Sequence, residues 1–147
     1  MSLNIPRLTE LADHLDGVPD EKFDLSNWFS TEPGIPLFVK WDTPITPGCQ
    51  TCACIAGETL VLFAPDTAVT IPAVQHRAAE LLGLTHPLNE WLFVPREYDS
   101  VVEDEEDTDE PDVLPEGWRM TDVKPDQAAR VIRHLIETQT VDWRILR

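Results

Sequence analysis

The chain has 147 residues and a mass of 16.6 kDa, and its 27 acidic residues against 11 basic ones give a formal net charge of −16. A chain of this length suits one compact domain that buries roughly 70% of its unfolded surface. The charge argues against direct nucleic-acid binding, which needs a basic face to displace counterions, and against contact with an anionic membrane surface. No apolar run reaches the roughly 18 residues of a membrane span.

The first 17 residues have neither a basic start nor an apolar core, so they do not resemble a secretory signal. Three cysteines are an odd number and too few for a disulfide framework. We therefore expect a cytoplasmic protein whose thiols are reduced.

Much of the negative charge is concentrated in one segment, because residues 97–116 contain eleven acids and no base. Such a block repels itself and has few apolar groups to bury. We expect one domain with three parts: a helical body at 1–96, an acidic mobile connector at 97–117, and a segment at 118–147 whose helix packs back on the body.

Apolar spacing predicts the first and last helices. In the helix predicted at 6–16, the positions i, i+3, i+4 and i+7 are Leu8, Leu11, Ala12 and Leu15. In the helix predicted at 125–138, the same pattern extends to i+8 through Ala128, Val131, Ile132, Leu135 and Ile136. Helices are also predicted at 72–82, with Gly83 as its stop, and at 86–93.

A helix predicted at 51–63 is apolar nearly all round, which is typical of the middle of a bundle. Thr51 is its expected N-cap. Gly57 in its interior costs about 1 kcal/mol relative to alanine, and a close crossing by another helix would explain it. The sequence thus predicts a mainly α fold: a small helical bundle around a central apolar helix (51–63), with one or two short strands, one of them at 37–41.

The densest group of reactive side chains is Cys49, Cys52 and Cys54. Cys49 and Cys52 have C-x-x-C spacing at the predicted helix start, where unpaired backbone N–H groups lower a thiol pKa. A regular helix, however, places Cys52 and Cys54 roughly 200° apart, so they cannot both face one ion. We favour a packing role for the cysteines, with a redox, metal or catalytic nucleophile role as alternatives.

A zinc site needs four ligands, and Cys49, Cys52 and Cys54 with His76 form the alternative metal set. No second C-x-x-C or H-x-x-x-H pair accompanies them, so we expect no metal or other cofactor. A solvated helix face explains His76 more simply, since it lies opposite the apolar stripe of its predicted helix.

Glu58 is the only charge in the predicted central helix and lies one turn from Cys54. A carboxylate inside a bundle would have a raised pKa and could serve as a catalytic acid or base. The alternative, which we favour, is that the helix has one exposed edge marked by Glu58. No hydrolase, zinc-protease, phosphate-loop or dinucleotide motif is present, so an enzyme is the less favoured class.

Three stretches carry a resemblance: F-D-L-x-x-W at 23–28, C-x-T-x-x-C-I-A-G at 49–57, and L-G-L at 82–84 followed by L-F-x-P at 92–95. Together they resemble a family of small, uncharacterised bacterial and phage proteins with the pattern F-D-[ML]-x-x-W … C-G-T-x-x-C-I-A-G … L-G-L … L-F-x-P. Gln50 stands here where that pattern has glycine. The resemblance implies no activity, but it implies that Cys49 and Cys54 matter more as a pair than Cys52.

The favoured function is a protein–protein interaction module whose acidic segment attracts a partner with a basic surface. One alternative is a thiol or metal site at Cys49, Cys52 and Cys54. A second is a phage-type acidic decoy of nucleic acid, which needs ordered acids spaced along a surface and fits one clustered run poorly.

Overall fold

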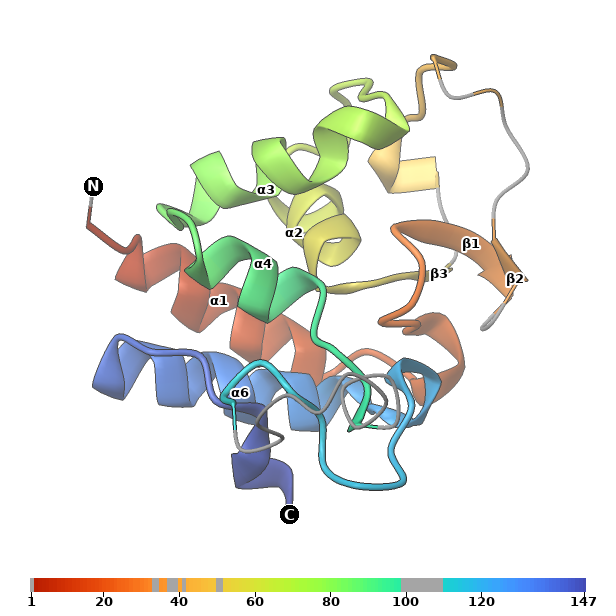
Figure 1. The fold of residues 1–147 in the computed structure, drawn as a ribbon. Coiled ribbons are helices and arrows are strands. Elements are labelled where there is room, and N and C mark those ends of the chain that lie inside the picture. The colour runs from red at the N-terminus through yellow and green to blue at the C-terminus, as the bar shows by residue number, and fades with distance from the viewer. Residues whose placement is uncertain (1, 33–34, 37–39, 41, 50–51, 99–109) are drawn as a thin grey trace.

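The computed structural model describes residues 2–32, 35–36, 40, 42–49, 52–98 and 110–147, and it has the predicted mainly α fold (Figure 1). Its helices are α1 (Ile5–Asp16), α2 (Ile55–Phe63), α3 (Val74–Leu82), α4 (Leu88–Phe93) and α6 (Pro125–Thr138). Short 3-10 turns are η1 (Asp20–Lys22), η2 (Pro47–Cys49), η3 (Ile71–Ala73), η4 (Met120–Asp122) and η5 (Trp143–Leu146). None of the described helices is long and apolar enough to cross a membrane.

The first and last helices, α1 and α6, pack side by side although they come from opposite ends of the chain (Figure 1). Their predicted apolar stripes face the core, and Leu8, Leu11, Ala128 and Ile132 are fully buried. The cap of α1 is Asn4, whose side-chain oxygen accepts a hydrogen bond from the Arg7 N–H. These two helices form one wall of the bundle.

Helix α2 contacts α1, α3 and α4, and every residue from Ile55 to Leu60 is buried. The prediction of a central apolar helix is therefore confirmed. Its expected start was wrong, because the helix begins at Ile55 and not at residue 51. Cys54 caps it, with Sγ accepting a hydrogen bond from the Gly57 N–H at 3.4 Å. Thr51, the expected cap, lies outside the described residues.

The residues just before α2 belong to a small antiparallel sheet with the strand order β2–β1–β3. Its strands are β1 (Phe29–Glu32), β2 (Ile35–Pro36) and β3 (Cys52–Ala53). Phe29 is paired with Ala53, and Ser30 with Cys52. This long-range pairing holds 52–53 extended and so delays the start of the helix. In the strand predicted at 37–41, residues 37–39 and 41 lie outside the described ones.

Gly57 sits at the point where α2 meets this sheet. A Cβ atom there would lie 2.1 Å from the Trp28 carbonyl oxygen and 2.7 Å from the Ala53 Cβ. The expected close approach therefore exists, but its partner is the chain entering β1 rather than a helix. Glycine is required here by contact and not by an unusual backbone angle.

The C-terminal end of the predicted connector is packed on the body. Arg96 forms a parallel bridge with Val113, and its Nε donates to Asp112 Oδ2 at 2.9 Å. Val113 and Leu114 are both 1% exposed. Part of the segment 97–117 therefore enters the core through these two apolar residues. Residues 99–109 lie outside the described part of the chain.

We expect Gly57→Ala to lower the free energy of unfolding by about 2 kcal/mol or more, measured by urea denaturation. Alanine gains about 1 kcal/mol in helix propensity, but the clash with the Trp28 carbonyl and Ala53 outweighs it. Gly17→Ala is the control, because Gly17 has φ −99° and a Cβ there meets only the His14 carbonyl at 3.5 Å. Equal stabilities of the two variants would contradict the tight contact.

Candidate functional site

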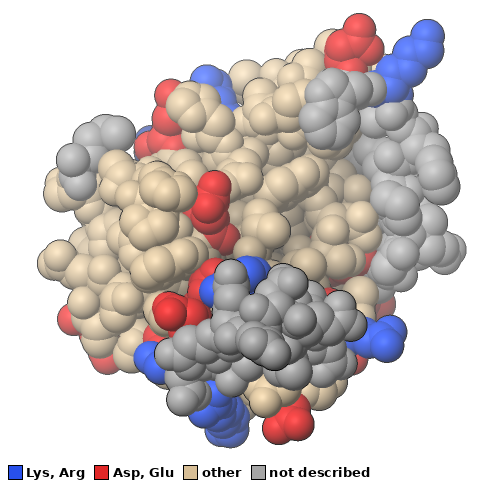
Figure 2. All heavy atoms as spheres, viewed as in Figure 1, with Lys and Arg blue, Asp and Glu red and all other residues tan. Residues whose placement is uncertain are grey.

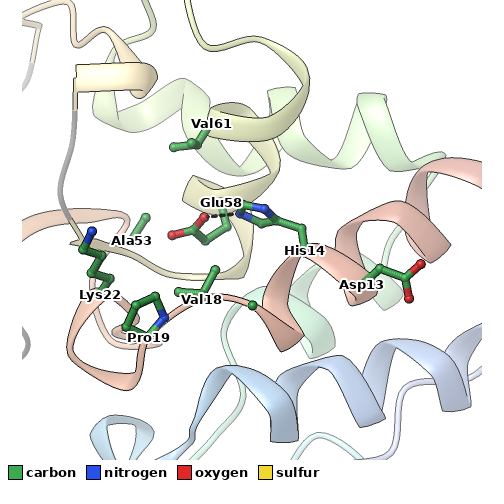
Figure 3. Close-up of a pocket in the computed structure, with 9 residues that line it drawn as sticks. Asp13, His14, Val18, Pro19, Lys22, Ala53, Glu58 and Val61 are labelled. Carbon is green, nitrogen blue, oxygen red and sulfur yellow. Dashed lines mark hydrogen bonds and ion pairs between the residues drawn. The ribbon is translucent and has the colours of Figure 1, made fainter.

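A pocket of about 540 Å³ opens where the end of α1, η1, β3 and α2 come together (Figure 3). Its volume lies in the range of small-molecule sites, roughly 300–1,000 Å³. The residues that line it are Asp13, His14, Gly17, Val18, Pro19, Lys22, Ala53, Glu58 and Val61.

The polar centre of the pocket is a pair formed by His14 and Glu58. His14 Nε2 lies 2.9 Å from Glu58 Oε2 (Figure 3). Glu58 is 7% exposed, so the expectation that it marks an exposed edge of α2 was wrong. The first turn of α2 is enclosed on this side by α1, from which the imidazole reaches across.

The pKa of Glu58 is raised above its ordinary value of 4.5 because burial disfavours the charged carboxylate. The hydrogen bond and the charge of His14 act in the opposite direction and lower it. Among the described residues, only His14 hydrogen bonds to this carboxylate. Figure 3 shows the other carboxylate oxygen pointing away from His14, toward the side where Lys22, Pro19 and Ala53 lie.

Cys52 and Cys54 are buried cysteines on β3 and at the cap of α2. Burial raises the pKa of the Cys54 thiol to about 12, although backbone hydrogen bonds near Gly57 and Ala56 lower it. The expectation that Cys52 lies in the first turn of a helix was wrong, since it is in a strand. Cys49 ends η2, and its side chain lies outside the described ones. Packing is the role that fits Cys52 and Cys54.

His76 lies on the exposed side of α3, and its Nε2 is 3.1 Å from Glu80 Oε1 one turn later. The exposure of His76 confirms the prediction that it lies on the solvated face of its helix. Within the described residues, no group of three or more His, Cys, Asp or Glu side chains is arranged to hold a metal ion. Of the alternative metal set, the described side chains of Cys52, Cys54 and His76 are therefore not brought together.

Sequence reasoning missed His14, although one signal was present. His14 follows the buried Leu11 by three positions, so it borders the apolar stripe of α1 instead of lying opposite it. Its partner is 44 positions away. No local spacing encodes such a pair.

Comparisons with models of protein families, with curated proteins and with solved structures found no match to the chain. The chemistry of the pocket and the distribution of charge therefore carry the functional conclusions.

We expect Glu58 to titrate above 4.5, and His14→Ala to raise its pKa further by removing the hydrogen bond and charge that lower it. The folded state then binds this proton more tightly than the unfolded chain does. The free energy of unfolding therefore falls as pH rises from 4.5 toward the folded pKa of Glu58, and it recovers as pH falls again. A carboxyl-carbon NMR titration measures the shift. His76→Ala is the matched control, and a lower Glu58 pKa in His14→Ala would contradict the assignment.

Cys54 should resist alkylation in the native protein. With a pKa of about 12, about one thiol in ten thousand is ionised at pH 8, and the sulfur is also buried. Iodoacetamide treatment followed by peptide mass spectrometry should show Cys54 unmodified before urea is added and modified afterwards. Rapid native labelling of Cys54 would show that the cap of α2 opens readily.

Proposed function

We propose that this protein is a protein-interaction module that binds a partner with a basic surface, and that it acts in the cytoplasm. The observation that carries the proposal is the segment 97–116, which holds eleven acids and no base in a chain of net charge −16. Such a field attracts a basic surface over long range and speeds association. Three cysteines, which are an odd number and too few for a disulfide framework, fit a reducing compartment.

The anchoring of this segment supports the proposal. Arg96 and Val113 lie side by side on the body, where backbone hydrogen bonds join Arg96 to Asp112 and Leu114. The two ends of the acidic segment are thus held together at one place on the body. A partner that binds this segment would also meet the neighbouring surface.

Acidic side chains elsewhere on the body are scattered, and Figure 2 shows them at several separate places on one face. This arrangement supports general attraction to a basic protein more than imitation of the regular phosphates of DNA. Imitation of nucleic acid is the alternative that the capture experiment below distinguishes. Nothing in the described geometry favours the thiol or metal alternative.

The test replaces the five acids at 103–107 with serine and asparagine and compares protein capture from a bacterial extract at low and high salt. We expect the wild-type chain to capture basic proteins at low salt, and the variant to capture at least about fivefold less, because the attraction is electrostatic and screened by salt. The control variant neutralises five exposed acids elsewhere, namely Glu10, Glu21, Asp42, Asp66 and Glu137.

Equal capture by wild type and the 103–107 variant would overturn the proposal. Displacement of the captured protein by DNA at low salt would favour the decoy alternative instead.

A further inference from the structure

The pocket beside α2 contains a carboxylate that is buried but incompletely paired. The Glu58 side chain is 9% exposed, and His14 is its one hydrogen-bond partner among the described residues. An ionised carboxylate can accept about four hydrogen bonds, and burying it without donors is costly. The Glu58 oxygen that points away from His14 therefore offers unused acceptor capacity to a ligand (Figure 3).

The walls of the pocket suit an apolar chain. Val18, Pro19, Ala53 and Val61 line it, from the chain between α1 and η1, from β3 and from α2. A volume of about 540 Å³ exceeds what one or two water molecules need. A ligand of a few carbons can lie against these walls while its polar end reaches Glu58.

The charges in and around the pocket favour a cation at that polar end. The ionised Glu58 carboxylate carries one negative charge, and His14 offsets this charge only when its imidazole is protonated. Asp13 adds a second at the rim, where Arg133 partly offsets it. Lys22 also lines the pocket, but its side chain is exposed, so solvent and salt screen its repulsion.

We propose that this pocket binds an ammonium or guanidinium group carried on a short apolar stem, with the cation on the Glu58 carboxylate. His14 is a positioning residue that fixes the carboxylate from the other side. The cation can come from a free small amine or from a lysine or arginine side chain of a protein, since both present the same chemistry. The proposal does not depend on the proposed function.

The test measures binding of n-butylamine and n-propylguanidine by NMR chemical-shift titration, with n-butanol as the uncharged analogue. We expect both cations to shift the amide signals of the pocket residues, and butanol to bind at least tenfold more weakly. Glu58→Gln keeps the size of the side chain and should weaken cation binding tenfold or more, because a charge-assisted hydrogen bond is lost.

Asp13→Asn is the matched control, because it removes one negative charge at the rim of the same pocket and leaves Glu58 in place. It should change binding less than about threefold, since exposed charges interact weakly. Val61→Phe is a second variant that fills the pocket while keeping the carboxylate, and it should abolish binding. The proposal is overturned if the cations bind no better than butanol, or if Glu58→Gln binds them as the wild type does.

A peptide distinguishes the two sources of the cation. If the natural ligand is a protein side chain, Gly-Gly-Lys-Gly-Gly should bind at least as tightly as butylamine, and its acetyl-lysine form should not bind. If it is a free amine, butylamine should bind and the peptide should not. Either result supports the site. If neither butylamine nor the peptide binds, the proposal is refuted.

Discussion

The contact between the first turn of α2 and the chain entering β1 is the constraint on which the rest of the structure depends. The Trp28 carbonyl approaches so closely that only glycine fits at position 57. The same contact holds Ala53 in β3 and leaves Cys54 to cap the helix. Because Ala53 and Glu58 flank this junction, the junction also sets the geometry of the pocket.

The Glu58 carboxyl, which is paired with His14, and the Cys54 thiol are two titratable groups that the fold buries. Desolvation acts on both groups but with different results. It leaves the Cys54 thiol protonated and inert at neutral pH, whereas the Glu58 carboxyl retains a partner that favours its charged form. A buried acid with a neighbouring imidazole and access to a cavity is the kind of group that binds ligands.

The helices with strong apolar periodicity could be predicted from the sequence, and α6 has the bounds expected, Pro125–Thr138. The start of α2 could not be predicted from the sequence, because residues 52–53 have the composition of a buried helix. Only their pairing with Phe29 and Ser30 holds them extended. The His14–Glu58 pair depends on how α1 lies against α2, which no spacing along the chain reveals. The packing of Val113 and Leu114 was hidden by the acids around them.

The bridge between Arg96 and Val113 has a consequence for how the chain tolerates change. Because the body holds Arg96 and Val113 side by side, the entropy of closing the chain between them grows only with the logarithm of its length. Doubling such a loop costs about 0.6 kcal/mol. The closure entropy that an insertion between these two anchors adds is therefore small, as long as the insertion leaves the hydrogen-bonded residues Glu97, Pro111 and Asp112 in place.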